Sequence, residues 1–302
     1  MRVFVAGGSG TIGVPLVRAL VQGGHDVVAT TRSPQRQDRL RALGATPAVV
    51  DALDADGLMR AVRDAAPTHV IHQLTALPKA GPKRASDVEP TNRLRVEGTR
   101  NLLRAAIAAR ATRIIGGSFA LLGAPSASAD SRPDAAREAV RSMESQLIDA
   151  ARAGSIEAIV LRYGLFYGGG SPSTDEIARF VRRRLLPAVR DDRSQLPYIH
   201  LDDAVSATVA ALDKGRSGEA YDIVDDRATS FSDMARAVAS AIGAPQPFVV
   251  PAWVPRLLMP YLARLYQIRL PLSNAAAVKE LGWRPRYPSI HEGLARALAR
   301  VA

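Results

Sequence analysis

The amino-acid sequence predicts an α/β protein whose main domain is a doubly wound parallel sheet, followed by a smaller C-terminal substrate lobe. Short apolar runs alternate with helical segments over residues 1–161, and this alternation is typical of parallel strands joined by right-handed helical crossovers. A glycine-rich turn follows the first apolar run, where a strand would pass into a helix. Beyond Arg162 the alternation is lost and prolines and glycines become frequent, which indicates a less regular unit.

The expected strands are short apolar runs of the kind that a parallel sheet buries on both faces. They cover residues 3–6, 26–31, 46–50, 70–73, 113–116 and 156–161. The expected helices lie between these runs, and glycines end the first two of them. They cover residues 11–22, 34–43, 55–65, 94–109 and 135–153. We expect residues 1–161, with about 197–225, to form the main domain, and 162–196 with 226–302 to form the substrate lobe.

The composition excludes several classes of protein. The chain has no cysteine, so disulfides, thiolate chemistry and cysteine-ligated metals are excluded. No run approaches the ~20 apolar residues that span a bilayer, and the N-terminus passes straight into a strand, so we expect a cytoplasmic protein without a signal peptide. The net charge is +11, yet only four of the 40 basic residues are lysines and the arginines are scattered, which favours solvated helix faces over a nucleic-acid surface.

Residues 251–272 combine Trp253, Tyr261 and Tyr266 with many apolar side chains. A packed cap over a small-molecule pocket is the preferred interpretation. A homodimer helix and a membrane-touching stretch are the alternatives, but prolines interrupt the segment and it is only partly amphipathic. We therefore expect a small-molecule substrate and no nucleic-acid or membrane partner, and we leave a homodimer open.

Gly7, Gly10 and Gly13 form a Gly-x-x-Gly-x-x-Gly turn between the first strand and the first helix. Gly7 permits the tight turn, Gly10 lets the backbone approach a pyrophosphate, and Gly13 lets the helix pack on the strand. The helix start, with Thr11 and Ile12, offers free N–H groups and the positive end of the helix dipole to phosphates. In this β-α-β context the turn predicts a Rossmann domain that binds a dinucleotide.

The end of the second strand indicates which dinucleotide binds. NAD enzymes usually place Asp or Glu there to bind the ribose 2′-hydroxyl, whereas this strand ends in Thr31 and is followed by Arg32. A guanidinium at that position can bind a 2′-phosphate through two hydrogen bonds. We therefore expect NADP(H) rather than NAD, held by Arg32. Arg36 is a second candidate, and an ordinary surface arginine is the alternative interpretation for both.

The chain carries six further motifs. They are Asp51-Ala52-Leu53-Asp54, Val70-Ile71-His72-Gln73-Leu74-Thr75, Gly98-Thr99-Arg100-Asn101-Leu102-Leu103, Leu161-Arg162-Tyr163-Gly164-Leu165-Phe166-Tyr167-Gly168, His200-Leu201-Asp202-Asp203 and Glu280-Leu281-Gly282-Trp283-Arg284-Pro285. Together with the glycine turn they resemble the extended short-chain dehydrogenase/reductase family, also called the NAD-dependent epimerase/dehydratase family. The resemblance covers nearly the whole chain. It implies that Asp51 meets the adenine amine and that Ala52 and Leu74 also lie at the cofactor.

The chain departs from this family where the chemistry is done. The family uses Ser or Thr with a Tyr-x-x-x-Lys pair, in which Tyr is the acid or base and Lys lowers its pKa. Ser118 matches the family's serine by its spacing to Gly123. If Glu144 is aligned with the glutamate that often follows the pair, Ala136 and Val140 stand at the Tyr and Lys positions, and no tyrosine occurs before residue 163. The usual acid or base is therefore missing.

Tyr163 and Tyr167 are the candidates to replace it, because the resemblance places them near the nicotinamide. Packing between the two units is the alternative interpretation for both tyrosines. A phenol without a neighbouring lysine is a poor base at neutral pH but an adequate donor, so we expect Ser118 and one tyrosine to polarise a carbonyl. Structural roles are expected for His72, for Glu144 and for Asp203, the last as the cap of a helix starting at residue 204.

Three functions fit this combination of features. We expect an NADP(H)-dependent oxidoreductase or epimerase that acts on a small carbonyl or hydroxyl substrate by a non-standard proton route. The alternatives are a non-redox isomerase, dehydratase or cyclase on the same fold, and a non-catalytic NADP(H)-binding sensor. The fold alone does not distinguish them.

Overall fold

The computed structural model describes residues 1–78, 84–123, 134–258, 263 and 265–297. Within these residues the main sheet has seven strands, every neighbouring pair of which is parallel, in the order β10-β6-β5-β4-β1-β2-β3. The strands are β1 (Arg2–Ala6), β2 (Asp26–Thr31), β3 (Thr46–Val49), β4 (His69–His72), β5 (Arg113–Phe119), β6 (Glu157–Tyr163) and β10 (Ala220–Ile223). The strand order reverses at β1, and ligands of open α/β sheets bind at such a switch point. The predicted fold class is confirmed.

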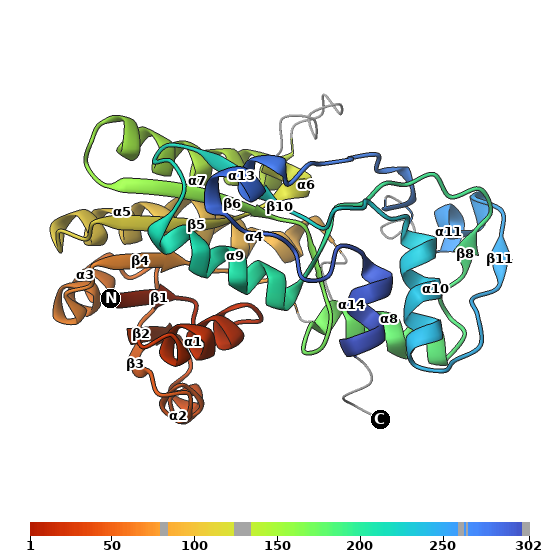
Figure 1. Cartoon of the computed structure of the whole chain (residues 1–302), viewed down its shortest axis with the longest axis horizontal. Helices are drawn as coiled ribbons and strands as arrows, with labels where there is room; N and C mark the ends of the chain where they lie inside the picture. Colours follow the sequence, from red (N-terminus) through yellow and green to blue (C-terminus); the bar gives the residue numbers. More distant parts are fainter. Residues whose placement is uncertain (79–83, 124–133, 259–262, 264, 298–302) are drawn as a thin grey trace.

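Helices cover both faces of the sheet (Figure 1). One core contains Val3 and Val5 with side chains from α1 (Gly13–Gln22), α9 (Leu201–Asp213) and α13 (Ala275–Leu281). The opposite core contains Phe4 and Ala6 with side chains from α3 (Ala55–Ala65), α5 (Thr99–Ala108) and α7 (Ala135–Arg152). Successive residues of β1 thus point to opposite faces, which is why the strands of this sheet are continuous apolar runs.

Short elements complete the main domain. They are η1 (Pro34–Arg36), α2 (Gln37–Ala42), η2 (Ala85–Val88), α4 (Glu89–Arg93), the π-turn η3 (Leu94–Gly98) and α6 (Ala120–Gly123). The expected helix 94–109 is therefore the last part of a longer helical segment, in which α4, η3 and α5 follow one another. The strands β5 and β6 extend beyond their apolar runs because they pair with each other as far as Phe119 and Tyr163. Ser118 consequently lies within a strand.

The smaller lobe, which the sequence led us to call the substrate lobe, lies beyond the carboxyl ends of the strands (Figure 1). Its own core includes Tyr167, Leu196, Phe231 and Val238. It contains the paired strands β7 (Leu165–Tyr167) and β9 (Tyr198–His200), the paired strands β8 (Ala188–Val189) and β11 (Val249–Val250), and the helices α8 (Pro172–Arg182), α10 (Phe231–Ala241), α11 (Trp253–Leu258), η5 (Leu265–Gln267) and α14 (Ile290–Ala297). Of the expected cap at 251–272, residues 259–262 and 264 lie outside the described residues. No described helix combines the length and apolar character that crossing a bilayer requires.

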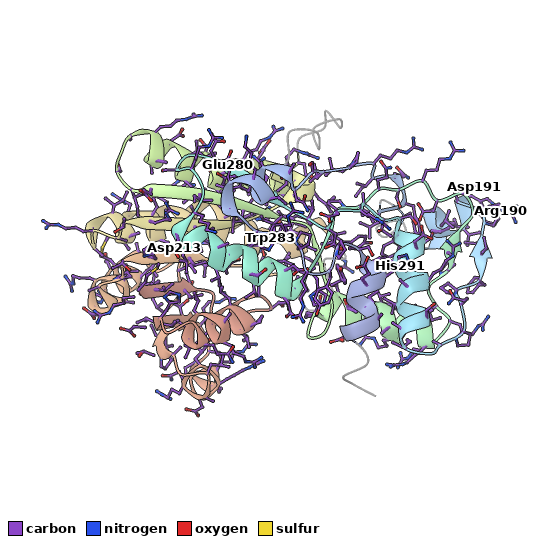
Figure 2. All side chains as sticks on the ribbon, in the orientation of Figure 1. Arg190, Asp191, Asp213, Glu280, Trp283 and His291 are labelled. Carbon is purple, nitrogen blue, oxygen red and sulfur yellow. The ribbon has the colours of Figure 1, made fainter. Side chains whose placement is uncertain are left out.

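The C-terminal segment does not follow the expected boundary throughout. Helix α13 and Trp283 pack into the core on the α9 face of the main sheet. The Trp283 indole donates to Ser206 Oγ of α9 at 2.8 Å, and the side chain lies against that helix (Figure 2). This stretch of the expected lobe segment 226–302 therefore packs with the main domain, and the chain returns to the lobe afterwards at α14.

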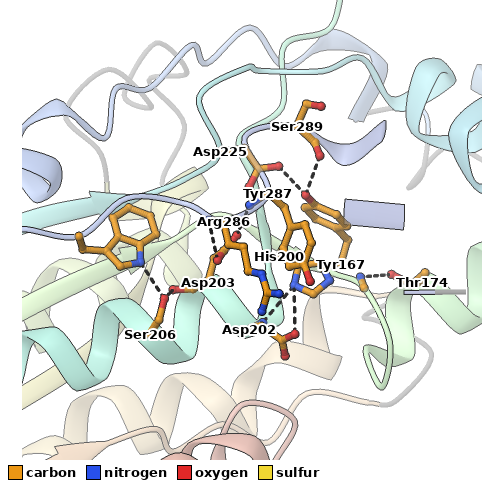
Figure 3. A network of polar contacts seen from close by, with 12 residues as sticks. Tyr167, Thr174, His200, Asp202, Asp203, Ser206, Asp225, Arg286, Tyr287 and Ser289 are labelled. Carbon is orange, nitrogen blue, oxygen red and sulfur yellow. Dashed lines mark hydrogen bonds and ion pairs between the residues drawn. The ribbon is translucent and has the colours of Figure 1, made fainter. Parts of the chain in front are cut away.

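The prediction that Asp203 caps a helix starting at residue 204 is wrong. Helix α9 begins at Leu201, and its cap is His200, whose Nδ1 accepts the N–H of Asp202 at 3.2 Å. Asp203 is buried in the first turn, and its carboxylate accepts the backbone N–H groups of Arg286 and Tyr287, both at 2.9 Å (Figure 3). Asp203 thus ties the returning C-terminal segment to the main domain.

Candidate active site and cofactor cleft

The glycine turn after β1 brings three backbone segments close together. Gly7 has φ +89°, and a Cβ there would lie 2.4 Å from the carbonyl oxygen of Gln73. A Cβ on Gly13 would lie 2.2 Å from the carbonyl oxygen of Gly7, so α1 can start there only with glycine. A Cβ on Gly10 would approach only that same carbonyl, at 3.2 Å. The turn therefore leaves open space beside Gly10, where the sequence places the pyrophosphate.

Neutral hydroxyls occupy the end of β2. Thr30 Oγ1 accepts the N–H of Gly7 at 2.9 Å, and Ser9 Oγ donates to Thr31 Oγ1 at 3.1 Å. These bonds hold the glycine turn against β2 without placing a carboxylate there. Arg32, the next residue, is exposed. The position that would carry the ribose-binding acid of an NAD enzyme is thus neutral and borders a guanidinium.

A cavity of about 430 Å³ lies beside this strand end, between Arg32, the residues that follow β3, and the first turns of α3. Asp51 Oδ1 accepts the N–H of Leu53 at 3.0 Å, and Asp54 caps α3 by accepting the N–H of Gly57 at 3.0 Å. A second guanidinium, that of Arg60, also lines the cavity. Sequence reasoning missed Arg60, because nothing in the motifs connects a helical arginine with the end of β2.

The cofactor residues expected from the sequence gather along one edge of the sheet. Thr11 and Ile12 complete the turn after β1, and Arg32 follows β2. Ala52 is buried after β3, where its carbonyl accepts the Asn101 side-chain amide at 3.0 Å. Leu74 follows β4 and is half-buried. The structure therefore brings these residues, with Gly7, Gly10, Gly13 and Asp51, to the carboxyl ends of four adjacent strands.

His72, at the end of β4, is structural as expected. Its side chain is buried, and Nε2 lies 2.8 Å from Thr99 Oγ1 of α5. Burial lowers the pKa of His72 to about 4, so the ring is neutral near neutral pH. Its Nδ1 accepts the N–H of Leu74 at 3.3 Å, which holds the chain where it leaves the strand.

Ser118 belongs to a buried polar cluster on the α7 face. Its hydroxyl donates to Glu144 Oε1 of α7 at 2.5 Å. The guanidinium of Arg162, the register partner of Ser118 on β6, binds the same carboxylate through Nε and Nη2, the shortest contact being 2.7 Å. The side chains of Arg162 and Glu144 are only 14% and 7% exposed. Burial lowers the pKa of the Arg162 guanidinium, but its bonds to Glu144 outweigh this and leave the pKa raised.

This cluster determines which hydrogen bonds Ser118 can still form. A hydroxyl has one proton, and a carboxylate can only accept, so the proton of Ser118 points to Glu144. The oxygen of Ser118 retains lone pairs for another partner. On α7, Val140 is buried and Ala136 is half-buried. Apolar side chains therefore occupy the positions aligned with the Tyr-x-x-x-Lys pair. Sequence reasoning assigned Glu144 a structural role but did not find its contact with Ser118.

Tyr163 lies on the opposite face of the sheet from Ser118. Strand residues alternate between faces; Arg162 shares the α7 face with Ser118, and Tyr163 points to α9. Its hydroxyl accepts from Gln73 Nε2 at 2.9 Å and lies 2.7 Å from Thr208 Oγ1. Since Thr208 donates its own proton to the carbonyl of Ala204, the phenol must donate to Thr208. Burial raises the pKa of Tyr163 to about 12.

Tyr167 lies in the core of the substrate lobe. Its hydroxyl donates to Asp225 Oδ2 at 2.8 Å and approaches the carbonyl of Ser289 at 3.1 Å (Figure 3). Burial, together with the Asp225 charge, raises the pKa of Tyr167 far above its ordinary value. The contacts of Tyr163 and Tyr167 therefore argue against the catalytic roles expected for them and favour the packing interpretation. The structure does not bring either tyrosine together with Ser118.

Comparison with known proteins connects this chain to reductases. It is 35% identical over 308 aligned residues to the 3-diazoavenalumate denitrifying reductase of a Streptomyces species, and the alignment covers 98% of this chain and 100% of that protein. It is 28% identical over 235 residues to the 4-hydroxy-2-methyl-3-oxo-4-farnesyl-3,4-dihydroquinoline-1-oxide ketoreductase of Stigmatella aurantiaca, covering 74% of this chain and 68% of that protein.

The fold also matches solved structures. The UDP-glucose 4-epimerase of Thermotoga maritima superposes with a TM-score of 0.80 at 22% identity, covering 100% of this chain and 98% of that one. The model of the NAD dependent epimerase/dehydratase family matches residues 3–224, which contain the glycine turn, the strand-end residues and Ser118. The protein therefore belongs to the NAD-dependent epimerase/dehydratase family.

Proposed function

We propose that this protein is an NADP(H)-dependent reductase of small molecules that transfers hydride without a tyrosine proton donor. One observation carries this proposal: the Ser118 proton points to Glu144, while alanine and valine stand where the resemblance expects the acid and its lysine. A site built in this way suits a substrate that accepts hydride and requires no proton from the protein. The neutral end of β2 beside Arg32 supports NADP(H) as the hydride donor.

A diazo-substituted aromatic compound is such a substrate. The relative from Streptomyces is a 3-diazoavenalumate denitrifying reductase, aligned over nearly the whole chain. In reduction of an aryl diazonium ion, hydride from C4 of the dihydronicotinamide forms the new C–H bond. The C–N bond then breaks, its electron pair leaves with N₂, and the arene and NADP⁺ are the other products. No proton enters this balance, so the reaction is compatible with the missing acid.

Carbonyl reduction is the second candidate, favoured by the ketoreductase from Stigmatella. The alkoxide that forms when hydride adds to a carbonyl must take up a proton. Ser118 could supply it only if its proton turned from Glu144 to the substrate oxygen and solvent then replaced it. This route differs from the one expected from the sequence, in which Ser118 acts with one tyrosine, and it requires a reorientation of the Ser118 hydroxyl that the diazonium reaction does not.

The two candidates are separated by following the hydride. The purified protein is incubated with NADPH deuterated at C4, on either face, and with benzenediazonium or a panel of small 3-oxo esters. Deuterium in the arene, with N₂ released at a rate above that of NADPH alone, supports the first candidate, and deuterium in an alcohol supports the second. A Gly10→Val variant serves as the matched control because it should not bind the cofactor. Product without nicotinamide oxidation would indicate an isomerase, and cofactor binding without any turnover would contradict the reductase and favour a sensor.

A further inference from the structure

Two arginines from separate elements line the cavity beside β2. Arg32 follows β2, and Arg60 lies in the second turn of α3. Both side chains are exposed, and both border the same space of about 430 Å³. Two guanidiniums that border one space, without carboxylates bound to them, favour an anion as the occupant of that space. Their convergence therefore points to an anionic group as the occupant.

Neither arginine has an ion-pair or hydrogen-bond partner that would explain its position, as far as the described residues go. For Arg60 this is informative because Asp56 and Asp64 stand four residues before and after it, at the spacing of helical ion pairs. Asp64 instead lies 3.9 Å from Arg63, its neighbour in sequence. Arg60 therefore borders the cavity and forms no ion pair with the carboxylates of its own helix.

The carboxylates of the cavity are engaged in shaping its wall. Asp51 and Asp54 both accept backbone N–H groups, in the turn after β3 and at the start of α3. Their oxygens can accept further hydrogen bonds from a ligand, and among the described residues neither forms an ion pair with the two arginines. The cavity thus offers both guanidinium donors and carboxylate acceptors, which suits a ligand that carries a phosphate and a hydrogen-bond donor such as the amine of adenosine.

We propose that Arg60 and Arg32 together bind the 2′-phosphate of NADP(H), which makes Arg60 a determinant of cofactor specificity. This inference rests on the proposed NADP(H) dependence. A phosphate can accept charge-assisted hydrogen bonds from two guanidiniums at once, each through its planar fork of donors. The rival second arginine is Arg36, four residues after Arg32. It lies in η1 and does not line the cavity.

The test is calorimetric titration of the protein with NADP⁺, NAD⁺, 2′,5′-ADP and 5′-AMP. Variants are Arg32→Ala, Arg60→Ala and Arg36→Ala, with Arg63→Ala as the matched control on the same helix. Arg60→Ala should weaken NADP⁺ and 2′,5′-ADP by roughly tenfold or more, as expected for loss of a charged hydrogen bond. It should leave NAD⁺ and 5′-AMP within about twofold of the parent. Arg36→Ala and Arg63→Ala should bind all four ligands like the parent.

The possible failures are distinguishable. Equal binding of NADP⁺ and NAD⁺ by the parent would overturn the proposed cofactor, and the role of Arg60 with it. Preference for NADP⁺ that Arg32→Ala reduces and Arg60→Ala leaves intact would overturn only the inference about Arg60. Loss of the preference in Arg36→Ala would assign the second contact to η1 instead. Thermal unfolding of each variant shows that a loss of binding is not a loss of fold.

Discussion

The carboxyl edge of the sheet has two halves that differ in chemistry. Over β1, β2 and β3, a glycine turn, neutral hydroxyls and two guanidiniums surround open space, and the expected residues lie together. Over β5 and β6, the serine of the family is present, but its hydroxyl belongs to a buried cluster with Glu144 and Arg162. The two halves thus differ in kind: the first surrounds open space with neutral and cationic groups, whereas the second fills its interior with an ion pair. We call them the cofactor half and the catalytic half, after the roles proposed above.

The first way to break this comparison is to close the cofactor half. Gly10→Val should abolish dinucleotide binding while the circular dichroism spectrum remains that of the parent, because the new side chain fills the space beside the turn and a Cβ meets only the Gly7 carbonyl. Gly13→Ala should instead destabilise the protein, because its Cβ would overlap backbone at 2.2 Å. Calorimetry measures the first effect and thermal unfolding the second. Retained NADPH binding in a folded Gly10→Val protein would show that the turn is not the phosphate site.

The second tests the buried ion pair of the catalytic half. Glu144→Gln should lower the free energy of unfolding by about 3–5 kcal/mol, because it leaves the buried Arg162 guanidinium without its charged partner. Glu157→Gln is the matched control at the other end of the same strand pair. Its partner Arg113 is also mostly buried, but that guanidinium donates to the carbonyls of Ala211 and Lys214 as well, and Glu157 itself is 48% exposed. There the loss should be about 1 kcal/mol or less. Urea unfolding measures both, and equal losses would mean that the Ser118 cluster is not stabilised by burial of this pair.

The third concerns the charge of the cofactor half. Arg32→Ala should cost about 1–3 kcal/mol of NADP(H) binding, the range for a charge-assisted hydrogen bond. It should have little effect on NAD(H), which has no 2′-phosphate. Titration of both cofactors against parent and variant measures the difference. If Arg32→Ala weakens the two cofactors equally, the guanidinium does not contact the 2′-phosphate.

The fourth asks which hydroxyl of the catalytic half takes part in turnover. Ser118→Ala should lower kcat by about tenfold or more if the substrate is a carbonyl, because Ser118 then delivers the proton, and should leave kcat within about threefold of the parent if it is a diazonium ion, which needs none. Tyr163→Phe and Tyr167→Phe should stay within about threefold of the parent, because both hydroxyls donate to internal partners. Steady-state kinetics measures all three. A large kcat loss confined to Tyr163→Phe would restore the tyrosine route expected from the sequence.

The fifth concerns the pH dependence of stability, which lies outside both halves. Burial raises the pKa of Asp225 to about 8, the charge of Asp203 adds to this, and the hydrogen bond from Tyr167 opposes it. Because the folded protein holds this proton more tightly than the unfolded chain, stability should fall as pH rises from about 4 to 8. Asp225→Asn should flatten that decline in the melting temperature. An unchanged pH profile in a folded Asp225→Asn protein would assign the decline to other groups.

The sequence alone determined much of the cofactor half. Alternating apolar runs specify parallel strands. The three glycines specify the turn, because Gly7 and Gly13 stand where backbone segments approach closely and Gly10 leaves space for a ligand. The sequence also shows that no acid follows β2 and that the Tyr-x-x-x-Lys pair is missing, because each of these features depends only on which residues stand in a short motif. These features depend on neighbours in sequence, which is why local reasoning found them.

Only the tertiary structure decided the remaining contacts. Whether Tyr163 faces Ser118 depends on how far β5 and β6 extend and on their register, which their mutual pairing determines. Ser118 bonds to Glu144, which is 26 positions away in the sequence. Arg32 shares its cavity with Arg60, which is 28 positions away. No periodicity in the sequence records such contacts, because they arise when helices α7 and α3 pack on the sheet and bring their side chains to its carboxyl edge.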